Sequence, residues 1–382
     1  MARNYKNSAK KKAQKAVERA VKKSPFLRAV ALILLLAIIA GGIYYYFFIY
    51  KKNQDNAPPA VGDLSFHFMV LGNEYAGDSV YIRAGENDIL IDAGSRKSSA
   101  DTIETYVNTY CKDGILEYVI ATHADQDHIA GFAGDDGIFN RYKCKTIIDF
   151  PKTNKDTLTY SEYVENRNNE VINDGATHYT ALECYREEKG AKRVYSLSES
   201  ITMEILYQKF YEENTSDEND YSVCLLFRHG NKSFLFTGDL EEEGEASLVD
   251  SNNLPEVDLF KAGHHGSKTS STNYLLSKIK PKNCVVTCVA GTDEYTDTIA
   301  NQFPTQAFID RISNYTDRVY VTTIGDIEFT NGQKFAPMNG NIVVSSSGAN
   351  AVTIKGSNND TILKDTEWFK AKRTTPSNWL VA

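Results

Sequence analysis

The sequence predicts an α/β fold in which helices cover two sheets, preceded by one transmembrane helix. Three observations lead to this prediction. Strand-like and helix-like segments alternate through the body of the chain, several strands end in His or Asp clusters, and one long uncharged run precedes the body. The chain has 382 residues, 42% hydrophobic and 24% charged, a composition that excludes a fibrous or mainly disordered protein. Its six cysteines are too few and too scattered for a disulfide-built scaffold, and the two that lie close together, Cys284 and Cys288, are expected to be buried free thiols.

The N-terminal part carries the signals of a membrane anchor. Residues 1–28 contain ten Lys or Arg and one acid, whereas residues 29–50 contain no charged residue. As a helix, this uncharged run would be about 33 Å long, enough to cross a bilayer core. The cationic side is expected to stay in the cytoplasm, which places the body outside the cell. A cleaved signal peptide is the alternative, but the apolar run continues past Ala40 and no A-x-A site follows.

Composition shifts divide the chain into five expected segments. They are a basic cytoplasmic tail (1–28), a transmembrane anchor (29–50), a short polar linker (51–61), one large domain (62–345) and a C-terminal extension (346–382). Beyond residue 28 the chain has a net charge of −17, whereas the basic tail has +9. The tail is expected to determine membrane topology, and a nucleic-acid role for it is the less favoured alternative.

The first half of the body alternates strands with helices. Short runs of apolar and β-branched residues predict strands at 64–71, 79–84, 88–91, 116–121 and 146–150. Helical stretches are expected at 101–110, 160–171 and 177–188. Asp101 is a candidate N-cap for the first helix, because its carboxylate can accept free backbone N–H groups.

The second half of the body repeats this pattern. Strands at 194–197 and 201–207 precede a hairpin, 221–228 and 232–237, that turns at His229-Gly230-Asn231. The remaining elements are a helix at 241–249, strands at 257–261 and 284–289, a helix at 305–313 and β-hairpins in the tail from about residue 317. Because strands and βα units occur twice over, two sheets covered by helices are expected.

The most informative motif lies directly after the strand at 116–121. In the run H-A-D-Q-D-H, four metal-ligand types occur within six residues: His123, Asp125, Asp127 and His128. Such tight spacing requires a loop to turn all four side chains inward. Imidazole nitrogen and carboxylate oxygen together suit a divalent cation. A polar loop of chance composition is the alternative, but it is improbable in a chain with only seven histidines.

Two further strands end in residues of the same kind. Asp239 follows the apolar run FLFTG, and His264 and His265 follow VDLFKAG. Sites of α/β layers tend to gather at the carboxyl ends of strands, and the neighbouring glycines allow the backbone to bend and approach closely. Each motif alone would be weak evidence. Together with the first motif they are strong evidence for metal binding.

The order of these motifs resembles the metallo-β-lactamase superfamily. Asp92-Ala93-Gly94, H-A-D-Q-D-H, T-G-D and H-H-G-S follow one another along the chain, and Asp125 with the H-H-G-S ending is similar to the extracellular hydrolase domain of ComEC-type DNA-uptake proteins. The resemblance implies an αβ/βα four-layer sandwich with a dinuclear metal site. It implies His123 and Asp125 on the first metal, Asp127, His128 and His264 on the second, Asp239 as the bridge, and Asp92 orienting the histidine loop.

Two departures from the family pattern are visible in the sequence. Many members carry another metal-binding His about where Asn219 or Asp220 stands here. A His-Pro-containing segment common in the subgroup is replaced by Asn301-Gln302-Phe303-Pro304. The first departure removes a ligand that the family pattern gives to the first metal, and so bears on whether that metal position is occupied.

The implied chemistry is hydrolysis by a metal-bound hydroxide, with zinc or manganese as the two divalent ions and no nucleotide cofactor. The three Asp in the ligand set move the preference from zinc toward manganese or iron. Asp127 or Asp239 could take a proton. His265 either packs behind the ligands or contacts the transition state, and Lys268 either faces a substrate phosphate or is solvated.

Three functions follow as hypotheses. The resemblance favours a membrane-anchored extracellular nuclease that cleaves DNA phosphodiesters. The net charge of −17 opposes general DNA binding, because affinity depends on Lys and Arg. Arg141, Lys143, Lys145 and Lys152 could form a compensating patch or a solvated surface. A hydrolase of small phosphodiesters or cell-surface headgroups is the second hypothesis. A non-catalytic surface binding module is the third, disfavoured by so complete a ligand set.

Overall fold

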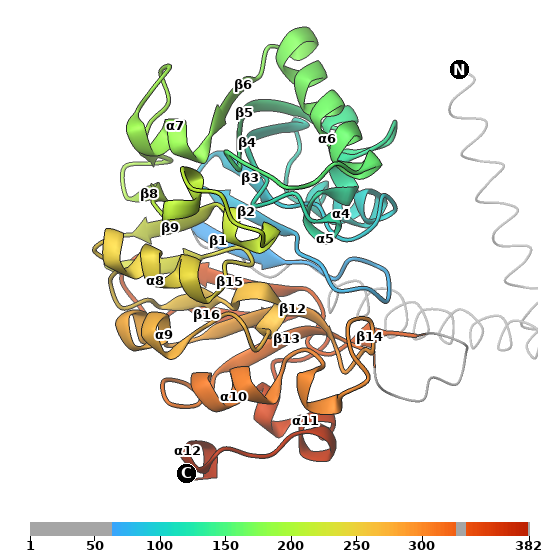
Figure 1. Cartoon of the computed structure of the whole chain (residues 1–382), viewed down its shortest axis with the longest axis vertical. Coiled ribbons are helices and arrows are strands. Elements are labelled where there is room, and N and C mark those ends of the chain that lie inside the picture. The colour runs from blue at the N-terminus through green and yellow to red at the C-terminus, as the bar shows by residue number, and fades with distance from the viewer. Residues whose placement is uncertain (1–62, 326–333, 381–382) are drawn as a thin grey trace, which may run out of the picture. The chain divides into compact units, whose positions relative to one another are not determined.

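The computed structural model describes residues 63–325 and 334–380 (Figure 1). The predicted basic tail, transmembrane anchor and linker lie outside these ranges, so the anchor remains a prediction. Within the two described ranges, no helix is both long and apolar enough to cross a membrane. All six cysteines are free and buried, which confirms the expectation for Cys284 and Cys288.

Two eight-stranded sheets form the centre of the fold. The first has the order β16-β15-β1-β2-β3-β4-β5-β6 and the second β14-β13-β12-β11-β10-β9-β8-β7. The strands of the first sheet are β1 (Leu64–Phe68), β2 (Val80–Ala84), β3 (Asn87–Ile91), β4 (Ile115–Ile120), β5 (Lys143–Asp149), β6 (Thr177–Thr180), β15 (Ile342–Ser346) and β16 (Thr353–Gly356). Those of the second are β7 (Val194–Ser196), β8 (Ile201–Leu206), β9 (Cys224–His229), β10 (Lys232–Phe236), β11 (Leu259–Lys261), β12 (Cys284–Ala290), β13 (Val319–Ile324) and β14 (Ala336–Pro337).

The sheets pack against each other through aromatic side chains. Phe66 of β1 lies with its ring centroid 4.7 Å from Phe234 and 5.3 Å from Phe236, both on β10. Each sheet also contains a parallel portion, β3-β4-β5-β6 in the first and β10-β11-β12-β13 in the second. The carboxyl ends of parallel strands meet at one edge, where sites of α/β folds form.

Helices cover the outer face of each sheet and complete the four layers. Buried residues of α4 (Ser99–Val107) and α6 (Leu158–Asn169) belong to the core of the first sheet. Buried residues of α8 (Glu242–Ser251), α9 (Asn273–Ile279) and α10 (Gln306–Ile312) belong to the core of the second. Figure 1 shows the two groups of helices on opposite sides of the paired sheets. The prediction of two helix-covered sheets is confirmed.

Two helix predictions need correction. The stretch 177–188 is the edge strand β6 followed by the short helix α7 (Ala181–Arg186). Thr180 ends the strand and starts the helix, because its hydroxyl and the Glu183 carboxylate form a capping box. The helix predicted at 101–110 begins two residues earlier, with Ser98 as N-cap, so Asp101 lies in its first turn and interacts with the helix dipole.

The C-terminal segment packs into the fold. Strand β16 is the edge of the first sheet. Trp368 of α11 (Glu367–Lys372) and Trp379 of α12 (Ser377–Leu380) are buried in the second core. The Arg373 guanidinium donates hydrogen bonds to the carbonyls of Pro304 at 3.0 Å and Gln302 at 2.7 Å. The tail therefore supports the loop that carries Phe303.

His67 makes the stability of the first sheet sensitive to acid. Its fully buried ring lies 2.9 Å from both the Tyr106 and the Ser65 hydroxyls. Burial, helped by the charge of Arg83, lowers the pKa of His67 to about 3. The unfolded chain therefore takes up a proton below about pH 6.5 that the folded chain excludes, so this contribution is complete above pH 6.5 and is lost as the pH falls.

We expect His67→Phe to flatten the pH dependence of stability. A neutral ring at this position has no proton to exclude, so the wild type should lose roughly 2 kcal/mol more than the variant between pH 6.5 and pH 5. Urea unfolding of both chains at the two pH values measures the difference. Equal losses would contradict the assignment of a neutral buried His67.

Candidate metal centre

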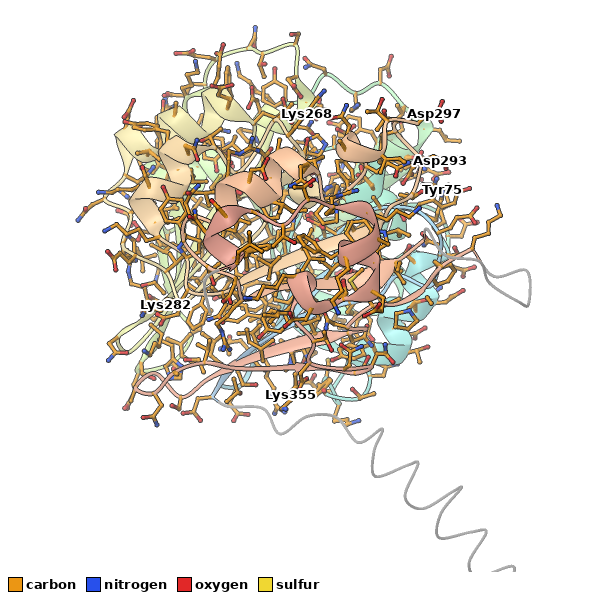
Figure 2. The ribbon with its side chains drawn as sticks, turned by 90° about the horizontal axis from the view of Figure 1, so that it is seen from below. Tyr75, Lys268, Lys282, Asp293, Asp297 and Lys355 are labelled. Carbon is orange, nitrogen blue, oxygen red and sulfur yellow. The ribbon has the colours of Figure 1, made fainter. Side chains whose placement is uncertain are left out.

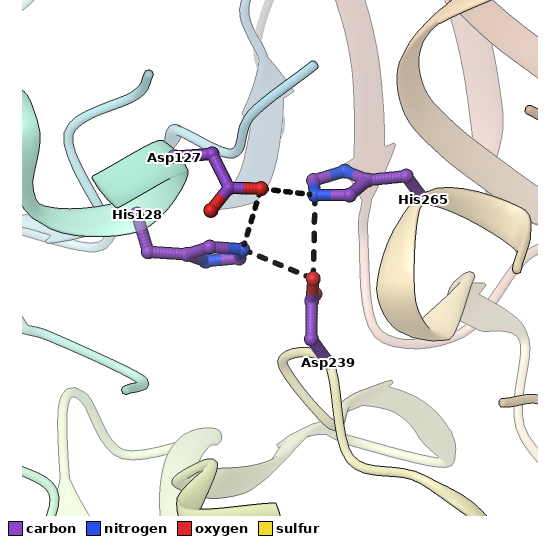
Figure 3. A group of neighbouring side chains, drawn as sticks. All are labelled: Asp127, His128, Asp239 and His265. Carbon is purple, nitrogen blue, oxygen red and sulfur yellow. Dashed lines mark hydrogen bonds and ion pairs between the residues drawn. The ribbon is translucent and has the colours of Figure 1, made fainter. Parts of the chain in front are cut away.

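Three strand ends bring four metal-ligand side chains together (Figure 3). Asp127 and His128 lie on the short helix α5 (Gln126–Ile129), which follows β4. Asp239 follows β10, and His265 lies in the tight turn that follows β11. The ligand atoms of all four side chains lie within 4.8 Å of one another. We call these four residues the cluster.

The side chains of the cluster point at one another from opposite walls of the site. His265 Nε2 lies 3.1 Å from Asp127 Oδ2 and 3.3 Å from Asp239 Oδ2. His128 Nε2 lies 3.1 Å from Asp239 Oδ2 and 4.0 Å from Asp127 Oδ2. Two imidazole nitrogens and two carboxylate oxygens around one point form a donor set that fits a divalent cation.

The charges of the cluster also favour the binding of a cation. Burial would raise the pKa of Asp127 and Asp239, but neighbouring histidines outweigh it and lower both. Burial opposes protonation of His265, but the charges of Asp239 and Asp78 raise its pKa to about 10. The buried carboxylates thus stabilise positive charge at this position, and a bound divalent ion would supply that charge.

Asp92 orients the histidine loop, as the resemblance implied. Its Oδ1 accepts from the Thr122 backbone N–H at 2.8 Å, and its Oδ2 accepts from the Thr122 hydroxyl at 2.8 Å. The same Oδ2 lies 2.7 Å from His128 Nδ1. A carboxylate behind a ligating His fixes the ring orientation and leaves Nε2 for the metal.

The turn after β11 decides which of two adjacent histidines faces the cluster. Both have positive φ, 45° for His264 and 54° for His265, a conformation that non-glycine residues rarely adopt. The two rings consequently diverge. His265 Nδ1 lies 2.7 Å from the Thr287 carbonyl, which leaves Nε2 for the cluster. His264 instead lies 3.0 Å from Glu241 Oε1. The ligand set implied by the resemblance named His264, whereas the structure brings His265 to the other three ligands.

A buried ion pair behind the cluster was not anticipated from the sequence. Lys261 is 2% exposed and pairs with Asp78, and its Nζ lies 3.5 Å from Asp239 Oδ1. Asp78 Oδ1 lies 3.3 Å from His265 Nδ1 and accepts the Thr287 hydroxyl. The signal available in the sequence was a lysine within an apolar strand, since lysine is almost never fully buried unless paired.

The remaining predicted residues lie beside the cluster or away from it. His123 Nε2 lies 3.6 Å from Asp125 Oδ2, and Asp125 pairs with Lys155. Lys268 lines a hollow of about 440 Å³ together with Glu242 and Arg311, and none of the cluster residues lines that hollow. Its predicted contact with a substrate phosphate remains untested.

The proposed basic patch is largely neutralised by its neighbours. Arg141 pairs with Asp101 at 2.6 Å and Glu104 at 2.7 Å. Lys145 pairs with Glu117 at 2.9 Å. Lys152 donates to the Glu212 carbonyl and to the Asn214 side chain. The third lysine of the patch, at position 143, lines a polar hollow with Asp113 and Asp174.

Comparison with known proteins agrees with the motifs. Residues 72–136 match the model of the "Metallo-beta-lactamase superfamily". The chain is 28% identical over 201 residues to Recombination protein 2 of Haemophilus influenzae, which covers 52% of this chain and 21% of that protein. It is 29% identical over 176 residues to ComE operon protein 3 of Bacillus subtilis, covering 45% and 20%. The matched segments thus span about a fifth of the length of these relatives.

Among solved structures, human tRNase Z, short form, matches with a TM-score of 0.35 and 12% identity, covering 68% of this chain and 92% of that one. This likeness is too weak to carry a conclusion about function.

Fold, motifs and relatives together identify the class of protein. Residues 72–136 match the metallo-β-lactamase superfamily, and the two helix-covered sheets are the architecture that the resemblance implied. The chain is also similar to proteins named for recombination and competence. With the donor set of the cluster, these likenesses support a metal-dependent hydrolase that binds a divalent cation.

Proposed function

We propose that the chain is a membrane-anchored extracellular phosphodiesterase that cleaves DNA with the help of zinc or manganese. The observation that carries the proposal is the convergence of Asp127, His128, Asp239 and His265 at the carboxyl ends of three strands. The anchor and its orientation rest on the charge pattern of residues 1–50. The DNA substrate rests on the likeness to proteins named for recombination and competence.

Each side chain of the cluster has a distinct part in this proposal. A divalent ion, when bound, supplies a Lewis acid and lowers the proton affinity of water. The two imidazoles and Asp239 are almost fully buried and would hold the ion, whereas the Asp127 side chain is 18% exposed. Asp127 therefore borders the accessible side of the site, where its carboxylate can also accept a proton from the attacking water.

An aromatic rim beside the cluster supports a nucleic-acid substrate. The Phe303 ring lies 5.7 Å from His265 and 5.4 Å from Tyr295, which is 57% exposed. The loop that carries Tyr295 lies against residues 75 and 76, since the Ala76 N–H donates to Glu294 at 2.8 Å and Figure 2 shows Tyr75 beside Asp293. An exposed aromatic ring at a phosphodiesterase site offers a stacking surface for a base of single-stranded DNA.

We expect Tyr295→Ala to raise KM for single-stranded DNA by about ten-fold, because stacking contributes about 1–3 kcal/mol per base. Turnover of a small chromogenic phosphodiester should change little, since that substrate has no base to stack. Steady-state kinetics on both substrates measure the difference between the two effects. Tyr274→Ala is the matched control, because Tyr274 is also exposed but lies on α9. Equal effects of Tyr295→Ala on the two substrates would contradict a stacking role.

The acidic surface favours a second candidate, a hydrolase of small phosphodiesters or cell-surface headgroups. The chain beyond residue 28 has a net charge of −17, and two residues of the basic patch, Arg141 and Lys145, are paired with acids. Such a surface suits a small substrate better than an extended polyanion.

One assay separates the two candidates. The full-length chain, purified in detergent, is incubated with manganese or zinc and with single-stranded DNA, double-stranded DNA or a small chromogenic phosphodiester. Cleavage of DNA that is lost in Asp127→Ala is the expected result. Cleavage of the small ester alone would replace the nuclease with the second candidate. No hydrolysis of any substrate by a folded, metal-loaded chain would favour a non-catalytic binding module.

A further inference from the structure

A lysine stands beside the position where the family resemblance places the first metal. Lys155 Nζ pairs with Asp125 Oδ1, and the other oxygen of Asp125 lies 3.6 Å from His123 Nε2. His123 Nε2 is buried and has no hydrogen-bond partner among the described residues. Asp125 therefore has a cation on one side and a metal-type ligand on the other.

Lys155 is held in place by a buried carboxylate. Glu218 is 6% exposed, and its Oε2 accepts from the Asn154 backbone N–H at 2.7 Å. Its Oε1 accepts from the Thr153 hydroxyl at 2.7 Å and from the Ala124 backbone N–H at 3.3 Å. One side chain thus ties the segment that carries Lys155 to the histidine loop. The pairing with Asp125 is part of a built network and differs from a surface contact of a mobile lysine.

The ligands left for a first metal are too few. Structural and catalytic zinc sites use at least three protein ligands, whereas His123 and Asp125 supply two. Asp239 would have to bridge as the third. Its Oδ2 faces His128 and His265, and its Oδ1 lies 3.5 Å from Lys261 Nζ. The second oxygen of the expected bridge is therefore directed toward a buried cation, away from a first metal.

An ammonium already lies beside the carboxylate that would bind a first metal. Lys155 Nζ pairs with Asp125 Oδ1, and the Lys155 side chain is only 32% exposed. The negative charge of Asp125 is thus compensated without a second divalent ion.

We propose that Lys155 supplies the positive charge of the first metal position, so that the chain binds one divalent ion tightly, in the cluster. The inference rests on the metal-dependent function proposed above and limits it to a single ion. It replaces the two ions implied by the family resemblance with one ion and one ammonium.

Counting bound ions tests this assignment independently of turnover. The full-length chain is loaded with manganese, or in parallel with zinc, dialysed and analysed by elemental mass spectrometry, and further uptake is followed by calorimetric titration. The wild type should retain about one ion per chain. Lys155→Ala should take up a second ion at least ten-fold more tightly than the wild type does. Lys152→Ala is the matched control, since Lys152 lies in the same segment but donates to Glu212 and Asn214.

Two results would overturn the inference. One is a wild type that retains two ions. The other is a Lys155→Ala chain whose second-ion affinity equals that of Lys152→Ala. Lys155→Gln provides a second variant if the alanine chain unfolds, which circular dichroism detects. A wild type with one ion and no hydrolase activity would leave the inference standing and overturn the proposed function instead.

Discussion

Asp127→Ala should lower turnover of any substrate by about three orders of magnitude or more while the chain stays folded. The substitution removes one of the four ligands of the cluster. Asp127 is also the more exposed of the two carboxylates in the cluster. Loss of a group that acts on the reacting atoms removes stabilisation of the transition state, where about 1.4 kcal/mol corresponds to each factor of ten. The measurement is kcat on the small chromogenic phosphodiester, with circular dichroism as the check on folding.

Stability of the metal-free chain should also fall, though less than activity. Against the effect of burial, His265 and His128 hold the pKa of Asp127 below its usual range, so the ionised carboxylate stabilises the folded state even though the charge of Asp239 opposes its ionisation. Removing Asp127 takes one carboxylate away from His265 Nε2, 3.1 Å from it, so the thermal midpoint should fall. Asp293→Ala is the matched control, an exposed acid on the neighbouring loop that should retain full activity. A fully active Asp127→Ala chain would show that the metal centre lies elsewhere.

Lys261→Met should destabilise the domain by about 3–5 kcal/mol, the usual cost of removing one partner from a buried ion pair. Lys261 and Asp78 are each 2% exposed, and Asp239 lies on the other side of the lysine. Methionine fills the space of the stem but leaves two carboxylates in the core without their cation. Urea unfolding, followed by circular dichroism, measures the loss.

The double variant Asp78→Asn/Lys261→Met should recover at least half of that loss, because it removes the charge that the single variant leaves unpaired. Lys282→Met is the matched control. Lys282 pairs with Asp258 at 2.9 Å, but its side chain is 60% exposed, so its effect should stay below about 1 kcal/mol. A double variant that is no more stable than Lys261→Met would contradict the charge argument and leave packing as the cause.

Much of the site could be predicted because its residues sit at strand ends. An apolar strand followed by H-A-D-Q-D-H, T-G-D or H-H-G-S specifies both the element and the edge where its last residues gather. That pattern correctly placed Asp127, His128 and Asp239 beside one another. Asp92, far earlier in the chain, was placed behind His128 by the family resemblance, and the 2.7 Å contact agrees with it.

The choice between His264 and His265 could not be made from the sequence. Two adjacent histidines flanked by glycines offer the same ligand type twice, and only the left-handed turn at both residues decides which ring faces the cluster. Spacing arguments assume regular strands or helices, and they fail where the backbone adopts positive φ. Asp78 was missed for a related reason, since it meets Lys261 only after the two sheets have packed together.

The position of Lys155 likewise depends on tertiary structure. Glu218 and Lys155 are far apart in the sequence, and their connection through Asn154 arises only where two loops meet beside the cluster. No local pattern in the sequence marks this contact. The pairing of Lys155 with Asp125 is the contact on which the proposal of one ion, in place of the two implied by the resemblance, rests.

Metal-dependent cleavage of DNA is the central claim, and reconstitution tests it most directly. The full-length chain is stripped with a chelator, and cleavage of labelled single-stranded DNA is followed as manganese or zinc is added back in steps. We predict no cleavage by the stripped chain, recovery that saturates near one ion per chain, and no recovery in Asp127→Ala. Cleavage by the stripped chain at an undiminished rate, or a loaded chain that binds its ion and leaves DNA intact, would contradict the proposed function.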